Sequence, residues 1–148
     1  MNKTTLDEFS PVIAEILAGE GTVRLRPKGQ SMRNFIREGR DEVILCKPVF
    51  PLRKGRVYFY RRENGMLILH RCIGVKNGLV FRGDNQAEKE YGVVPGQIIG
   101  EVSQVIRGHR TIHAGGWTDV FFAVTAYPVF LCKKIIKTVL GCAPTRKS

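Results

Sequence analysis

Residues 56–82 read RVYFYRRENGMLILHRCIGVKNGLVFR. Three short segments of this stretch are rich in Val, Ile, Leu, Tyr and Phe, a composition typical of β-strands. Asn-Gly dipeptides at 64–65 and 77–78 separate the segments, and Asn-Gly is favoured in tight hairpin turns because both positions tolerate positive φ. Two consecutive hairpins follow from this pattern, so residues 66–75 are expected to form a central strand of an antiparallel sheet.

Further strand-like segments lie on both sides of these hairpins. The complete set expected from composition and alternation comprises residues 22–26, 42–46, 56–61, 66–75, 79–82 and 97–107. With no repeat, low-complexity tract or long linker, the sequence predicts one domain over residues 1–148, of mostly β (α+β) class.

The first segment, residues 1–21, predicts an amphipathic helix. Apolar residues recur at helical spacing from Leu6 to Leu17, and glycines at 19 and 21 end the pattern. Because Pro11 lies inside this pattern, a helix that begins at Ser10 is the alternative.

Residues 117–142 predict a carboxy-terminal helical region outside the β core of residues 22–107. The segment 120–140 is apolar, but Pro128 and three lysines interrupt the run of about 20 residues that a membrane-spanning helix needs. A helical hairpin packed on the sheet is expected. The alternative is an interfacial helix whose lysines face anionic lipid headgroups, giving peripheral contact with the inner membrane surface.

Composition limits the partners and the compartment. The net charge of +11 attracts anionic groups, but the basic residues are dispersed and no aromatic residues alternate with them, so specific nucleic-acid binding is not expected. The four cysteines form no C-x-x-C pair, and the chain does not start with a basic region followed by an apolar run. These features predict a cytoplasmic protein with reduced thiols.

Three residues suggest a nucleophilic site. Ser31 follows the first predicted strand in the sequence Gly-Gln-Ser-Met, although a serine beside glycine is commonly turn chemistry alone. His70 lies in the apolar central strand, where an imidazole needs a hydrogen-bond partner and can accept a hydroxyl proton near neutral pH. Asp84 follows the strand that pairs back on that of His70, so it is expected to orient the imidazole, as the acid of a catalytic triad does, or else to form an Asx-turn.

The order of these blocks resembles the serine peptidases related to signal peptidase I and LexA-type repressors, over residues 26–105. Residues 29–32 (GQSM) are similar to the nucleophile box, residues 69–74 (LHRCIG) to the base box, and residues 83–85 (GDN) with 98–102 (IIGEV) to the closing boxes. The whole chain resembles the small, unanchored bacterial members.

The resemblance implies an antiparallel β peptidase domain in which Ser31 is the nucleophile and its backbone N–H stabilises the oxyanion. His70 stands where many members have lysine, which implies a base of the histidine type. Glu90 occupies the place of a second acid, usually Asp in that type. Two positions depart from the pattern, with Asn34 in place of a proline and Gly29 in place of a serine that donates to the oxyanion.

The substrate implied is a peptide or protein that binds as an added strand beside the site, with Gln30, Met32 and Cys72 expected to contact it. Two alternatives to an endopeptidase remain. One is a catalytically silent peptide-binding or regulatory module, and the other is a self-cleaving regulator. No cofactor is expected, nor a metal site, because His109 and His113 lie in strand-like or loop sequence and no nearby Cys or acid completes a ligand set.

Overall fold

The computed structural model describes residues 3–115, with side chains from Phe9 onward. The predicted helical region 117–142, with its proposed membrane contact, lies outside the described residues. Within residues 3–115, one α-helix precedes a single antiparallel sheet, so the mostly β (α+β) class is confirmed. No helix in this range is both long and apolar enough to cross a bilayer.

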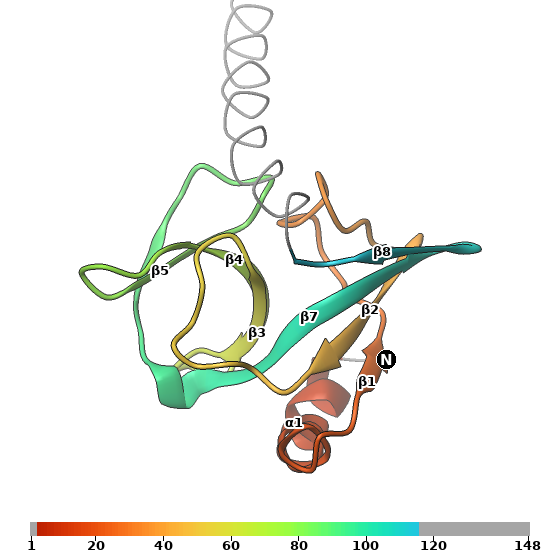
Figure 1. The fold of residues 1–148 in the computed structure, drawn as a ribbon, viewed down its shortest axis with the longest axis horizontal. Coiled ribbons are helices and arrows are strands. Elements are labelled where there is room, and N and C mark those ends of the chain that lie inside the picture. Colours follow the sequence, from red (N-terminus) through yellow and green to blue (C-terminus); the bar gives the residue numbers. More distant parts are fainter. Residues whose placement is uncertain (1–2, 116–148) are drawn as a thin grey trace, which may run out of the picture.

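The helix α1 (Lys3–Ala18) precedes the sheet and packs against it at one end (Figure 1). Pro11 lies inside α1, so the alternative start at Ser10 is wrong. A proline inside a helix removes one backbone hydrogen bond. The buried side chains of Ile13 and Leu17, which reach the core, help to offset that loss.

The eight strands confirm the predicted segments to within two residues and add two that composition did not single out, β6 and β8. They are β1 (Val23–Leu25), β2 (Asp41–Cys46), β3 (Val57–Arg61), β4 (Leu67–Gly74), β5 (Leu79–Arg82), β6 (Glu90–Val93), β7 (Ile98–Arg107) and β8 (Arg110–His113). The 3-10 turn Pro95–Gln97 leads into β7.

The sheet order is β1-β2-β7-β3-β4-β5-β6, and β8 pairs with β7. The long strand β7 crosses the molecule and is central to the sheet (Figure 1). β2 lies along one of its edges, while β3 and β8 pair with successive halves of the other. β4 lies between β3 and β5, which confirms the two consecutive hairpins.

Both hairpin turns use the glycine of the Asn-Gly pair, but not the asparagine, for positive φ. Gly65 has φ 81° and Gly78 has φ 101°, while Glu20 is the one non-glycine residue with positive φ in the described range. Asn64 instead accepts a hydrogen bond from the Met66 N–H with its side-chain oxygen, at 3.1 Å. The Asn64 side chain therefore stabilises this turn by a hydrogen bond, in place of the positive φ that was expected at Asn64.

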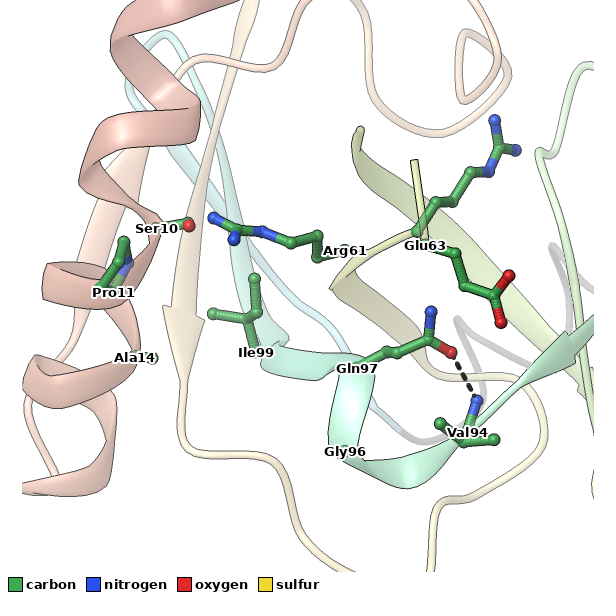
Figure 2. Close-up of a pocket in the computed structure, with 10 residues that line it drawn as sticks. Ser10, Pro11, Ala14, Arg61, Glu63, Val94, Gly96, Gln97 and Ile99 are labelled. Atoms are coloured by element: carbon green, nitrogen blue, oxygen red, sulfur yellow. Dashed lines mark hydrogen bonds between the residues drawn. The ribbon is translucent and has the colours of Figure 1, made fainter. Parts of the chain in front are cut away.

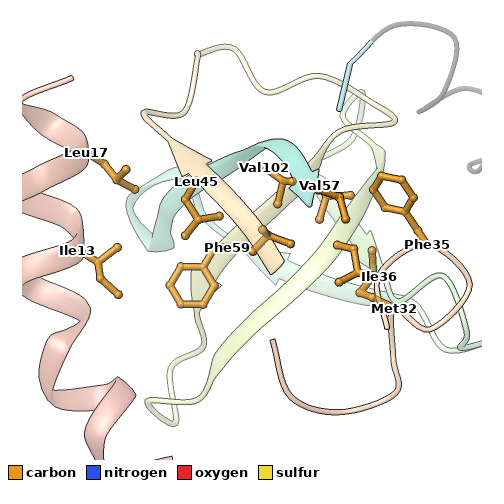
Figure 3. Close-up of a cluster of buried hydrophobic side chains, with 11 residues drawn as sticks. Ile13, Leu17, Met32, Phe35, Ile36, Leu45, Val57, Phe59 and Val102 are labelled. Carbon is orange, nitrogen blue, oxygen red and sulfur yellow. The ribbon is translucent and has the colours of Figure 1, made fainter. Parts of the chain in front are cut away.

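Two hydrophobic clusters lie on opposite faces of β3. Val57 and Phe59 belong to the first cluster, which also includes residues of α1, β2, β7 and the turn after β1 (Figure 3). Tyr58 and Tyr60 belong to the second, with residues of β4, β5, β6 and β7. Because alternate residues of a strand face opposite sides, β3 is buried on both faces, and the second face is the one that carries His70.

Candidate active site

Ser31 lies in a tight turn between β1 and β2. Gly29, at φ 94°, occupies the left-handed region, where a serine such as the family pattern has would be strained. Met32, which follows Ser31, is buried in the first cluster, and its carbonyl accepts hydrogen bonds from the N–H groups of Phe35 and Ile36 at 2.8 and 2.7 Å. Core packing therefore fixes this turn, while Ser31 itself stays partly accessible.

The turn after β5 packs directly against the Ser31 turn. The Asn85 N–H donates to the Ser31 carbonyl at 2.7 Å, and the Asn85 side chain donates to the Gln30 carbonyl at 3.2 Å. Gly83 makes the approach possible, because a Cβ at this position would lie 2.9 Å from the Ser31 Cβ and 2.7 Å from its carbonyl oxygen. Hydrogen bonds thus join the Ser31 turn and the turn of residues 83–85 into one unit.

Asn34, which stands where the peptidases that the sequence resembles have proline, belongs to the same unit. Its side-chain N–H₂ donates to the Asp84 carbonyl at 2.6 Å. The hydrogen bond across the two turns provides a constraint that a proline would have provided within one turn.

His70 lies on β4 opposite Tyr58, and 5% of its surface is exposed. Its Nδ1 is 3.3 Å from the Tyr60 hydroxyl oxygen and 3.5 Å from Glu90 Oε2. Burial lowers the pKa of His70, and the charge of Glu90 only partly offsets this effect. The imidazole is therefore held in its neutral, basic form at neutral pH.

Nε2, the other ring nitrogen of His70, has no hydrogen-bond partner within residues 3–115. In the same range no side-chain nitrogen or oxygen is both sealed from solvent and without a partner. The two observations together indicate that Nε2 is not sealed from solvent.

Glu90 is anchored by two neighbours. Tyr60 donates to its Oε2 at 2.7 Å, and the guanidinium of Arg62 donates to both carboxylate oxygens at 2.6 Å each. Partial burial alone would raise the pKa of Glu90, but the hydrogen bonds from Arg62 and Tyr60 lower it below its ordinary value. Glu90 is thus an ionised, fixed acid beside the imidazole, in the region expected for the second acid.

Asp84 does not make the contact that was expected of it. Both of its carboxylate oxygens accept hydrogen bonds from Arg71, at 2.8 and 2.7 Å, and the two side chains are almost completely buried. The reason lies in strand alternation, because Arg71 follows His70 and points to the opposite face of β4. The acid that faces the imidazole is Glu90, and Asp84 instead holds the turn that contacts Ser31.

No family model, curated protein or solved structure matches the chain.

The three residues expected to contact substrate differ in exposure. Gln30 is exposed beside Ser31. Met32 is 4% exposed and accepts a weak hydrogen bond from the Asp84 N–H through its sulfur, at 3.4 Å. Cys72 is fully buried in the second cluster. The side chains of Met32 and Cys72 therefore fill the core, and of the three residues Gln30 alone is exposed.

Other features of the surface lie apart from these residues. A cavity of about 490 Å³ lies between α1 and the β3 end of the sheet, with Arg61 extending toward the helix (Figure 2), and neither Ser31 nor His70 lines it. His109 is in the turn between β7 and β8, and His113 ends β8. No cluster of three metal-ligating side chains exists within residues 3–115.

Tyr60, Arg62 and Arg71 are the site neighbours that sequence reasoning missed. The alternation of the strand 56–61 could have indicated Tyr60 as a neighbour of the site, since Tyr58 and Tyr60 are two residues apart and share one face. The signal for Arg71 is its place in an apolar strand, because a buried arginine needs an acid as its partner.

Proposed function

We propose that the protein is a serine endopeptidase of the signal peptidase and LexA type, with Ser31 as nucleophile and His70 as general base. The observation that carries this proposal is that the Ser31 turn packs against residues 83–85, the turn after β5, and β5 pairs with the strand β4 that carries His70. Ser31 contacts Gly83 and bonds to Asn85, and Arg71, the neighbour of His70, bonds to Asp84.

The strand register supports a position of Ser31 and His70 on the same face of the sheet. Arg71 pairs with Arg82 and Cys72 with Phe81, so one further step of the register sets His70 opposite Gly83. Directly opposed residues of an antiparallel pair share a face. A Cβ at position 83 would lie 2.9 Å from the Ser31 Cβ, so Ser31 packs on the same side of this turn, although no hydrogen bond joins its hydroxyl to the imidazole within residues 3–115.

The reaction then proceeds by acyl transfer. The Ser31 oxygen attacks the peptide carbonyl while Nε2 of His70 takes the hydroxyl proton, and the C–N bond breaks as that proton passes to the leaving amine. Water, deprotonated by the same nitrogen, releases the acyl group and regenerates Ser31. The backbone N–H of Ser31 has no hydrogen-bond partner within the described range, so it can donate to the oxyanion.

The substrate is proposed to bind as an extended strand beside β1. This strand is at the end of the sheet, and within residues 3–115 no other strand pairs with its outer edge, where an added strand could bind. An apolar groove of about 730 Å³ borders it, lined by α1 residues such as Phe9 and Val12 and by Val23 and Leu25 of β1. Because β1 leads directly into the Ser31 turn, a peptide along its edge would approach the nucleophile.

The test is labelling of Ser31 by a serine-reactive acylating probe, followed by intact mass, together with hydrolysis of a fluorogenic peptide library. We expect one adduct in the wild type, none in Ser31→Ala, and a strong loss in His70→Ala. An adduct that survives Ser31→Ala would reject the nucleophile. Absence of labelling and hydrolysis in the wild type would favour the catalytically silent peptide-binding module.

In keeping with its thiols, the proposed compartment is the cytoplasm.

A further inference from the structure

The hydroxyl group of Tyr60 lies between the ring of His70 and the carboxylate of Glu90. Its oxygen is 2.7 Å from Glu90 Oε2 and 3.3 Å from His70 Nδ1. A direct contact between Glu90 and Nδ1 is longer, at 3.5 Å. The path from imidazole to acid therefore runs through the phenol.

The proton positions along this path follow from the chemistry of the end groups. Glu90 is ionised and can only accept, so the Tyr60 proton points at the carboxylate. Burial and the neighbouring Glu90 raise the pKa of Tyr60 above its ordinary value, and the phenol keeps its proton at neutral pH. The Tyr60 oxygen is then left as an acceptor. Arg62 also interacts with this oxygen but already donates to both oxygens of Glu90, so the hydrogen bond between Tyr60 and His70 is one that Nδ1–H donates.

We propose that Tyr60 is a positioning residue that holds His70 in the Nδ1–H tautomer and so leaves the Nε2 lone pair to accept the Ser31 proton. This inference rests on the proposed function, because the proton that Nε2 would accept is that of the Ser31 nucleophile. A free neutral imidazole favours the opposite tautomer, which carries the proton on Nε2. In that tautomer Nε2 has no lone pair with which to accept the Ser31 proton.

Arg62 makes the arrangement rigid. Its two hydrogen bonds fix the Glu90 carboxylate, and the carboxylate in turn fixes the rotation of the Tyr60 hydroxyl. Tyr60 itself is fully buried, with its ring 4.8 Å from that of Phe81, so the phenol cannot swing away. The acid therefore acts on the imidazole through a fixed hydroxyl group.

The experiment records ring nitrogen-15 shifts of labelled protein at neutral pH, with His70 assigned by the spectrum of His70→Gln. We expect the wild type to show a protonated Nδ1 and a bare Nε2. Tyr60→Phe keeps the ring packing but removes the acceptor, so the Nε2–H form should become substantial. The rate of probe acylation should fall about tenfold or more, with little change in the binding of peptide.

Tyr58→Phe is the matched control, because it removes a second buried hydroxyl from the same strand. Tyr58 accepts a hydrogen bond from the Arg53 N–H at 3.0 Å and makes no hydrogen bond to His70. Its variant should keep the wild-type tautomer and pH profile. An unchanged tautomer and rate in Tyr60→Phe would overturn the inference.

The wild-type spectrum decides the matter even if a variant does not fold. A proton found on Nε2 in the folded wild type would overturn the role of Tyr60 outright. If the tautomer is as expected but the probe labels no protein, the proposed peptidase function fails while the hydrogen-bond chain stands. The two results therefore test the two proposals separately.

Discussion

Arg71 donates hydrogen bonds to both carboxylate oxygens of Asp84, and both side chains are almost completely buried. The guanidinium also donates to the Gly55 carbonyl at 2.5 Å and lies 5.1 Å from the centre of the Phe35 ring. Arg71 thereby joins the turn after β5, the loop before β3 and the Ser31 turn. The pair is a structural support of the site.

The first prediction concerns this pair. Asp84→Asn leaves a buried guanidinium without its counter-charge, which should lower the free energy of unfolding by about 3–5 kcal/mol. Urea denaturation followed by fluorescence measures the loss. Replacing both partners, in Arg71→Met with Asp84→Asn, removes the uncompensated charge and should recover much of the stability. If the single variant is as stable as the wild type, the pair does not support the turn.

The second prediction concerns Asn34. Its hydrogen bond to the Asp84 carbonyl is short and partly buried, so Asn34→Ala should cost about 1 kcal/mol of stability. Labelling of Ser31 should slow as well, since the two turns would no longer be tied. The neighbouring Arg33 is exposed, and Arg33→Ala serves as the control for a change in the same turn. Equal labelling rates in the two variants would show that the tie is dispensable.

The fold could be predicted from the sequence largely because each strand carries a local signal. Alternating apolar residues and the glycines of the two hairpin turns are properties of short segments, and they placed β4 correctly between β3 and β5. β6 gave no such signal, since Tyr91 and Gly92 are exposed in this edge strand. Its pairing with β5 depends on the sheet, which already provides a partner edge.

The acid at the site was harder to predict, for a physical reason. A hairpin places Asp84 near β4 whichever face its side chain takes, so proximity in the hairpin could not distinguish His70 from Arg71. The choice depends on strand alternation carried through the turn. Glu90 comes from a further strand, and its contact with His70 depends on Tyr60, which the sequence pattern identifies only as a strand residue.

The third prediction is a pH dependence. Only neutral His70 can act as a base, and burial lowers its pKa from the ordinary 6.5. The rate of Ser31 acylation should therefore fall in acid with a midpoint below pH 6.5. Glu90 raises the pKa of His70, so Glu90→Gln should move the midpoint further toward acid. A midpoint above 6.5 in the wild type would contradict this account.

The same shift has a consequence for stability. The pKa of His70 is lower in the folded than in the unfolded state, so the unfolded state binds more protons as the pH drops below 6.5. The contribution of His70 to stability is present above pH 6.5 and is lost as the pH falls toward its folded pKa. His70→Gln should flatten this part of the curve of unfolding free energy against pH.

The last prediction tests the contact between Gly83 and Ser31. A Cβ at position 83 would come within 2.7 Å of the Ser31 carbonyl and 2.9 Å of its Cβ, and neither atom can yield without moving the turn. Gly83→Ala should therefore displace the nucleophile, and a displacement near 1 Å costs about 10²-fold in rate. Gly96→Ala is the control, since nothing lies within 4 Å of its added Cβ. Probe labelling of both variants gives the comparison. Equal labelling rates in the two variants would mean that the reactivity of Ser31 does not depend on its packing against Gly83. The turn of residues 83–85 would then no longer support a common site of Ser31 and His70.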